Sequence, residues 1–275
     1  MKLNYQTAME RLDADSADKK VLELLSAIKG FQISELTSLS AKQLLLIADK
    51  LGISEASMRM ALSRQTKQGK LIRDNGKYSL AKSKNSFVLP RFWLDLKKRN
   101  LNWSGQWLLV NQLQHKFSPT IMRRLHNKAE LLGFKFFHNL GWVRPNNLSD
   151  LLEETAFHFH SIVEQPQMLI GNLTDIDAGT THLFTQSWPL DELNQFYVDA
   201  NELIVNECQS VESLSDKDIL VRSFAIGRLV VEYLSKDPWL PGTLINLPAR
   251  TRLFDKTVEY YQQITPMWLN VMKQA

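Results

Sequence analysis

The sequence predicts an α+β protein in three parts: an N-terminal winged helix–turn–helix, a ferredoxin-like middle part and an all-α C-terminal part. Three observations predict this class. Helical periodicity leads into a strand–turn–strand pattern before residue 84, an alternation of strands and helices follows from 106 to 170, and only helical periodicity remains after 188. We expect a DNA-binding domain at 1–84, a linker helix at 85–102, a ferredoxin-like domain at 103–185 and a helical domain at 186–275.

Charge is distributed unevenly along the chain. Residues 1–99 hold 19 Lys or Arg against 10 Asp or Glu, whereas residues 100–275 hold 14 against 19. A basic N-terminal third on an acidic remainder favours a module that binds a polyanion, attached to a body that senses or oligomerises. The alternative is a chance drift of surface charge, but the basic excess coincides with a helix–turn–helix pattern.

Composition also bounds the class of protein. With 44% hydrophobic residues the chain is expected to fold, and its one cysteine, Cys208, excludes an intramolecular disulfide framework. The sequence has no run of about 18 apolar residues, and the polar N-terminus does not resemble a signal peptide. We therefore expect a cytoplasmic protein without a membrane partner.

Three helices are predicted in the N-terminal part. The first, Lys19–Lys29, carries an apolar face that ends at Gly30. Ser40 is the expected N-cap of the second helix, which leads into a tight turn at Gly52. Ser54 then caps a third helix that runs to Gln68.

The third helix has two distinct faces. Met58, Ala61, Leu62 and Gln65 share one face by helical spacing and are expected to pack inward. Gln65 is polar where an apolar residue is expected, so either it forms a buried hydrogen bond or the helix is rotated slightly from this assignment. The residues expected on the outward face are Ser57, Arg59, Met60, Ser63, Arg64 and Lys67.

The next segment has the pattern of a β-hairpin. Lys70–Arg73 and Lys77–Leu80 flank Asp74-Asn75-Gly76, a strong turn signal. The hairpin would form a wing with Arg73, Asn75 and Lys77 near DNA. With the outward face of the third helix these residues form the expected DNA-binding set, in which Ser57, Arg59 and Ser63 lie nearest the bases and Arg64 and Lys67 reach phosphates. The alternative is an ordinary solvated helix surface.

The rest of the chain supplies the other predicted elements. Strands are expected at Gln106–Val110, Phe134–Phe137, Trp142–Arg144 and Met168–Ile170, with helices at Pro119–Leu132 and Leu148–Val163. Helices are then expected at Leu190–Glu207, Ser215–Ser235 and Arg252–Met272. Their apolar stripes suit either a dimer interface or an internal core.

No catalytic or metal-binding pattern stands out. His158 and His160 lie two residues apart, so on a helix they point in different directions and cannot share a metal ion. Cys208 has no recognisable partner motif, and no phosphate-binding glycine loop or nucleophile elbow is present. We expect no enzyme activity, no metal and no cofactor.

Several motifs together carry a family resemblance. The segment Leu51–Leu71 resembles the PaaX family of bacterial transcriptional repressors, which control phenylacetic acid degradation. Trp103–Trp107 is similar to the W-x-G-x-W signature of that family. Leu132–Phe134 with Gly141–Pro145 is similar to its GF…GVWIRP region, and Asp237–Pro241 matches its DP-x-LP motif.

The resemblance implies a homodimeric repressor that binds double-stranded operator DNA and is released by an acyl-CoA effector, phenylacetyl-CoA in the best-known members. Such an effector needs cations for its phosphates and an apolar slot for its acyl group. The candidate effector residues are Arg123, Arg124, Trp142, Arg222, Arg228 and Arg250. Each arginine has the alternative role of an internal salt-bridge partner. Alternatives for the whole chain are a winged-helix adaptor that binds RNA or a protein partner without small-molecule control, or a metabolic enzyme.

Overall fold

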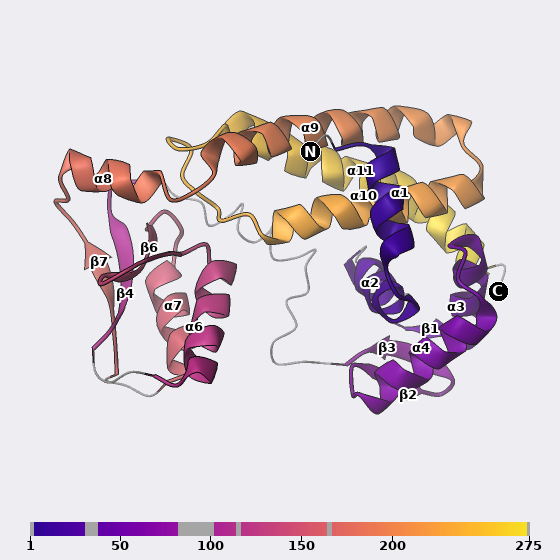
Figure 1. Ribbon diagram of the computed structural model, residues 1–275. Coiled ribbons are helices and arrows are strands. Elements are labelled where there is room, and N and C mark those ends of the chain that lie inside the picture. Colours follow the sequence, from indigo (N-terminus) through magenta and orange to yellow (C-terminus); the bar gives the residue numbers. More distant parts are fainter. Residues whose placement is uncertain (1–2, 31–37, 82–101, 114–116, 164–166, 274–275) are drawn as a thin grey trace. The chain divides into compact units, whose positions relative to one another are not determined.

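The structure is a computed structural model that describes residues 3–30, 38–81, 102–113, 117–163 and 167–273. Within these residues the chain contains ten α-helices and two small antiparallel sheets, so the predicted α+β class is confirmed (Figure 1). The predicted linker helix at 85–102 lies almost entirely outside the described residues.

The chain divides into two compact units by its contacts. Unit 1 contains Met1–Trp93, Val198–Ser235 and Thr251–Ala275, and unit 2 contains Leu94–Tyr197 and Lys236–Arg250. Each unit therefore combines segments that are far apart in the sequence. The domain boundaries predicted above follow chain order and stay a prediction.

The N-terminal part of unit 1 is built from four helices and a three-stranded sheet. The elements are α1 (Tyr5–Ala14), α2 (Ala17–Gly30), β1 (Leu39–Ser40), α3 (Ala41–Lys50), α4 (Glu55–Lys67), β2 (Leu71–Asp74) and β3 (Lys77–Leu80). The sheet has the order β1-β3-β2, with β3 antiparallel to both neighbours.

Local sequence explains where α3 and α4 begin. Ser40 and Gln43 form a capping box, in which each side chain bonds the backbone N–H of the other residue, at 3.1 and 2.9 Å. The Ser54 side chain accepts a bond from the Ser57 N–H at 3.2 Å. Both predicted caps are confirmed.

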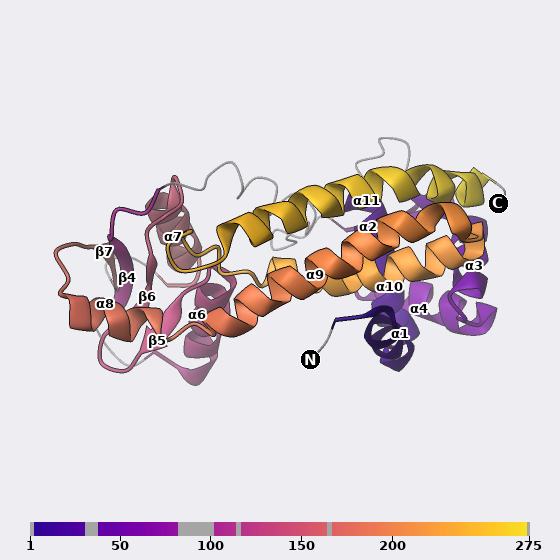
Figure 2. The same cartoon turned by 90° about the horizontal axis from the view of Figure 1, so that it is seen from above.

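Three long helices of the C-terminal part complete unit 1. They are α9 (Leu190–Ser210, of which the part from Val198 onward belongs here), α10 (Asp216–Ser235) and α11 (Leu247–Lys273, from Thr251 onward), and Figure 2 shows them side by side. The Trp268 indole of α11 donates to the Ser223 hydroxyl of α10 at 2.9 Å. On the other side of α10, α1 packs through Arg11, whose guanidinium lies over the Tyr233 ring.

Unit 2 contains a four-stranded sheet with helices on both faces. Its elements are β4 (Trp107–Gln112), α6 (Pro119–Leu131), β5 (Lys135–Phe137), β6 (Gly141–Pro145), α7 (Leu151–His160), β7 (Met168–Leu173) and α8 (Ala178–Thr185). The strand order is β5-β6-β4-β7, and every neighbouring pair is antiparallel.

Aromatic side chains show how the helices cover this sheet. Trp142 of β6 contacts His126 of α6 and Phe159 of α7 on one face. Val110 pairs with Trp142, so the side chains of these two residues lie on the same face of the sheet. Trp107 is three residues before Val110 on β4 and therefore lies on the opposite face, where it contacts Phe184 of α8. Unit 2 is therefore layered, with α6 and α7 on one face and α8 on the other.

Some elements differ from the expectations. Helices α1 and α8 were not predicted, because their apolar residues are too few to mark a periodic face over eight to ten residues. Helix α7 is shorter than the predicted 148–163, and α11 begins before Arg252. Helix α10 ends at Ser235, ahead of Pro238, close to the predicted end. In the described part of the chain, no helix is long and apolar enough to cross a membrane.

Candidate nucleic-acid interface

Helix α4 presents the two faces that its sequence predicts. Met58, Ala61, Leu62 and Gln65 are buried, which confirms the inward face. The six residues predicted to face outward, Ser57, Arg59, Met60, Ser63, Arg64 and Lys67, are all exposed. Met60 keeps 59% of its surface exposed.

The hairpin that follows α4 has the turn that its sequence predicts. Asp74 pairs with Lys77 in the ladder, so Asn75 and Gly76 form a two-residue loop. Both have positive φ, 47° and 75°, as the type I′ turn requires. Arg73, Asn75 and Lys77 are exposed, and the Arg73 guanidinium lies 5.6 Å from the centre of the Tyr78 ring. We call the nine exposed residues of α4 and the hairpin the basic face.

Two residues at the start of α4 are held by neighbours one turn away. Arg59 contacts the Glu55 carboxylate through Nε at 2.7 Å and through Nη2 at 2.6 Å. The Ser54 and Ser57 hydroxyls are 2.9 Å apart. These contacts orient Arg59 and Ser57 along the exposed side of the helix, where the guanidinium still has donors free for another acceptor.

A carboxylate from α2 reaches the C-terminal half of α4. Asp18 Oδ2 lies 2.6 Å from Arg64 Nη2, and Asp18 Oδ1 accepts from Gln65 Nε2 at 2.8 Å. Gln65 therefore forms the buried hydrogen bond that was one of the two explanations for its polar side chain. No sequence pattern indicates the role of Asp18, because its partners lie 46 and 47 residues away.

Helix α2 is in turn held by α10. The Arg228 guanidinium contacts both Asp15, just before α2, and Glu23, one turn beyond Asp18. Burial raises the pKa of Glu23, against the opposing charge of Arg228. Burial acts in the same sense on Asp15, but the Lys19 hydrogen bond and the charges of Arg228 and Lys19 outweigh it and leave its pKa below the ordinary value.

The candidate effector residues do not share one environment. Arg123 and Arg124 are exposed on α6, and Trp142 is buried with its indole N–H donating to His126 at 3.2 Å. Arg222 makes a two-pronged contact with Glu207, at 2.6 and 3.0 Å. With Arg228 on Asp15 and Arg250 near Asp237, three of the five arginines have the salt-bridge role that was their alternative.

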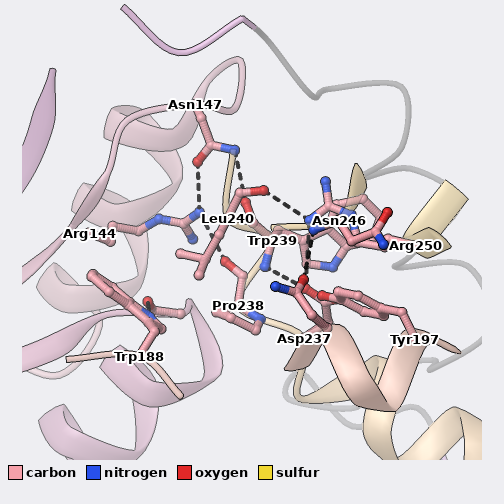
Figure 3. A network of polar contacts seen from close by, with 12 residues as sticks. Arg144, Asn147, Trp188, Tyr197, Asp237, Pro238, Trp239, Leu240, Asn246 and Arg250 are labelled. Carbon is pink, nitrogen blue, oxygen red and sulfur yellow. Dashed lines mark hydrogen bonds and ion pairs between the residues drawn. The ribbon is translucent and has the colours of Figure 1, made fainter. Parts of the chain in front are cut away.

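Unit 2 contains a set of buried polar residues that we call the buried polar cluster: Arg144, Asn147, Tyr197, Asp237 and Arg250. Figure 3 shows the segment 237–240 running between Arg144 and Asn147 on one side and Tyr197 and Arg250 on the other. The segment is the DP-x-LP motif, so two of the motifs singled out from the sequence meet here.

Arg144 and Asn147 bind the backbone of this segment. Arg144 donates to the carbonyl oxygens of Leu132 and Pro238, the latter at 3.3 Å. Asn147 donates to the Trp239 carbonyl at 2.8 Å and accepts from Arg144. Trp239 has a φ of 52°, a strained backbone for a bulky residue that these bonds hold in place.

Asp237 is the centre of the other half of the cluster. Its carboxylate accepts from the Tyr197 hydroxyl and the Trp239 N–H, both at 2.7 Å, and lies 3.8 Å from Arg250 Nη1. Arg250 also donates to the Leu240 carbonyl at 3.0 Å. Burial raises the pKa of Asp237 against the charge of Arg250 and these hydrogen bonds. The cluster holds a loop rather than opening onto solvent.

In the described part of the chain, no three His, Cys, Asp or Glu residues lie together in a way that could hold a metal ion. Burial raises the pKa of the half-buried Cys208 thiol, which disfavours the thiolate form.

Two comparisons with known proteins found matches, one over the N-terminal part of the chain and one over most of it. The family model described as PaaX-like protein matches residues 26–84. Among solved structures, the uncharacterized protein Rv0674 from Mycobacterium tuberculosis is similar over 92% of this chain and 98% of that chain, at 19% identity and a TM-score of 0.57. At this identity the likeness concerns the fold alone. No curated protein matches the chain. The predicted resemblance to the PaaX family is thus confirmed over residues 26–84, the segment that carries α3, α4 and the β2–β3 hairpin.

Proposed function

We propose that this chain is a DNA-binding transcriptional regulator of PaaX type, in which α4 enters the major groove. The observation that carries the proposal is the basic face: Arg59, Arg64 and Lys67 lie exposed on one helix, within the segment that matches a family of regulators. An exposed helix with cations and small hydroxyl residues suits contacts with base edges and phosphates at once. Regulation rather than catalysis is the role that this arrangement favours.

The proposed architecture is a winged helix–turn–helix. Helix α3, the turn at Gly52, α4 and the β2–β3 hairpin follow one another in the order of that motif, with β1 as the third strand. The hairpin would act as the wing that contacts the backbone or the minor groove. In unit 2, the order β5-β6-β4-β7 with α6 and α7 on one face supports a ferredoxin-like arrangement.

Contacts divide between reading and positioning in this proposal. Ser57, Arg59 and Ser63 lie toward the N-terminal and central turns of α4 and would meet the bases. Arg64 and Lys67 would meet phosphates, and Arg73, Asn75 and Lys77 would meet the backbone or the minor groove. An Arg59 contact with guanine O6 and N7 would contribute about 1–3 kcal/mol of discrimination.

Repression by a homodimer and release by an acyl-CoA, such as phenylacetyl-CoA, complete the proposal. A ligand shifts binding only if it favours a dimer geometry that no longer matches the spacing of two half-sites. Of the candidate cations, Arg123 and Arg124 are exposed neighbours on α6 and lack an ion-pair partner among the described residues. They are the residues we would assign to the phosphates of the effector.

The DNA-binding role is tested in two stages. Fluorescence anisotropy with a labelled random-sequence duplex first measures affinity across a salt series. Selection from a random duplex library then supplies a preferred sequence. We expect Arg59→Ala to reduce the preference for that sequence, and Lys67→Ala to weaken all sequences alike and lower the salt slope by about one. An affinity for duplex DNA that does not change with salt concentration would contradict the proposal. A higher affinity for structured RNA than for duplex DNA in direct competition would contradict it as well.

The effector is tested by thermal shift. Phenylacetyl-CoA at about 100 times its dissociation constant should stabilise the chain by about 2.7 kcal/mol. Free CoA and phenylacetate serve as separate controls for the two halves of the ligand. Arg123→Ala with Arg124→Ala should remove the shift, while Arg252→Ala, a change at a cation outside the candidate set, should retain it. Loss of the shift only in Arg252→Ala would exclude the assignment to α6.

A further inference from the structure

Two cations of the basic face are paired within the chain, Arg59 with Glu55 of its own helix and Arg64 with a carboxylate from another helix. Arg64 Nη2 lies 2.6 Å from Asp18 Oδ2, although the Arg64 side chain remains 53% exposed. Asp18 belongs to α2, a different helix from the one proposed to contact DNA. The ion pair therefore sets the orientation of the Arg64 guanidinium, a candidate phosphate contact, in the absence of DNA.

The carboxylate of Asp18 is fixed by a second bond. Its other oxygen accepts from Gln65 Nε2 at 2.8 Å, and the Gln65 side chain is buried among the apolar residues of α4. A buried amide costs free energy unless its polar atoms are paired. Gln65 occupies a position where the periodicity of α4 favours an apolar residue, so its amide has a specific use: it holds the carboxylate beside Arg64.

Helix α2 itself is fixed on both sides of Asp18. Arg228 of α10 contacts Asp15 on one side and Glu23 on the other, and these carboxylates lie three residues before and five residues after Asp18. Lys19 adds an ion pair with Asp15 at 2.9 Å. Asp18 is therefore carried on an anchored helix and cannot follow Arg64 outward to a phosphate.

We propose that Asp18 is a positioning residue that restrains Arg64 and so lowers the affinity of the basic face for DNA of arbitrary sequence. The inference rests on the proposed DNA-binding function. A carboxylate in direct contact offsets part of the guanidinium charge, and the salt-dependent part of phosphate binding depends on that charge. Base contacts by Arg59 and its neighbours would then decide a larger share of the affinity, which raises the ratio of specific to non-specific binding.

The test is the salt dependence of binding to a random-sequence duplex of about 30 base pairs. Asp18→Asn removes the charge but keeps an oxygen that accepts from Gln65. We expect it to bind more tightly than the unaltered chain at low salt, with a slope of log affinity against log salt steeper by about 0.9. That slope corresponds to about 3.5-fold more loss of affinity between about 50 and 200 mM salt.

Two controls separate this effect from a general change of charge. Asp13→Asn removes an equal charge from an exposed position on α1, and we expect it to leave the slope unchanged. In an Arg64→Ala background, Asp18→Asn should change neither slope nor affinity, because the restrained cation is gone. An equal gain in Asp13→Asn, or a gain that persists without Arg64, would overturn the inference.

Folding is monitored in the same variants by their thermal unfolding. An unchanged slope in an Asp18→Asn chain that is still folded shows that Asp18 does not restrain Arg64, and overturns the inference while the DNA-binding function stands. A chain that binds no duplex DNA in its unaltered form removes the proposed function itself. The two failures are therefore distinguishable.

Discussion

The basic face and the buried polar cluster both depend on arginines, but the two regions give them opposite surroundings. Arg59 lies on one side of a single helix and keeps most of its side chain in solvent. Arg250 is buried, with 1% of its surface exposed, and its partners Asp237 and Leu240 belong to the loop that follows α10. The residue type is the same, so it is the environment that separates a ligand contact from a structural one.

The difference predicts a separation of effects. An exposed ion pair contributes little to stability, because water and salt screen it. A buried charge without its partner costs several kcal/mol, since desolvation is no longer offset. Changes in the buried polar cluster should therefore act on folding, and changes on the basic face should act on DNA binding.

The largest expected effect follows from removing Asp237. Asp237→Ala leaves Arg250 and the Tyr197 hydroxyl without their acceptor, and should lower the free energy of unfolding by about 3–5 kcal/mol. Urea unfolding followed by tryptophan fluorescence reports mainly on unit 2, which holds Trp107, Trp142, Trp188 and Trp239, whereas Trp268 lies in unit 1.

Glu130→Ala is the matched control for this substitution. Glu130 is an exposed acid near the end of α6 in the same unit, and its loss should change stability by no more than about 0.5 kcal/mol. If Asp237→Ala lowered the free energy of unfolding no more than the control does, the buried polar cluster would not stabilise unit 2 as proposed.

The next effect tests how closely the loop of Trp239 approaches the turn after α6. Gly133 has a φ of 79°, and a Cβ atom there would lie 2.6 Å from the Pro238 carbonyl oxygen. Gly133→Ala should cost about 3 kcal/mol, from the left-handed backbone and from the clash together.

Gly105 separates those two contributions. It also has a positive φ, 88°, but open space surrounds the position of its Cβ atom. Gly105→Ala should cost only about 1–2 kcal/mol, the backbone part alone. Equal costs at the two glycines, measured by the same fluorescence-detected unfolding, would show that the loop yields to the added methyl group.

The basic face could be predicted from sequence because its determinants are local. The Ser40 and Ser54 caps, the inward positions of α4 and the Asn75-Gly76 turn all depend on residues within a few positions of one another. The resemblance to the PaaX family rests on the same short segment. What could not be derived there was the Asp18 contact, which requires knowing how α2 packs on α4.

The buried polar cluster could not be predicted, although two of the sequence motifs meet in it. Arg144 and Asp237 lie 93 residues apart, and periodicity gives no information on which loop meets which strand. The sequence also makes Arg228 and Arg250 candidate effector residues, because it shows their charge but not the carboxylates that they contact in the structure. Helices α1 and α8 were missed because short helices depend on tertiary packing more than on their own pattern.

A smaller effect tests the border of the basic face. Ser54→Ala removes the cap of α4 and should cost about 1 kcal/mol. Ser54→Asp keeps a capping oxygen and adds a charge that suits the helix N-terminus, so stability should be retained. The same charge lies beside Ser57 and should weaken binding to a random-sequence duplex. Stability from circular dichroism and affinity from anisotropy should thus respond in different variants; a joint loss in Ser54→Asp would contradict the separation.

The smallest effect concerns Asp15 and Glu23, the two carboxylates that Arg228 contacts. Their contributions to stability should change with pH in opposite directions. The pKa of Asp15 lies below 3.8, so its contribution to stability is complete above that pH and is lost as the pH falls below it. The pKa of Glu23 lies above 4.5, so the folded state holds its proton more tightly and the contribution of this group decreases as the pH rises above 4.5.

Asp15→Asn should therefore flatten the loss of stability in acid, and Glu23→Gln should flatten the decline in stability above pH 4.5. Urea unfolding followed by circular dichroism across this range measures both slopes. If the two substitutions changed the dependence of stability on pH in the same direction, burial would not distinguish Glu23 from Asp15, and the prediction would be wrong.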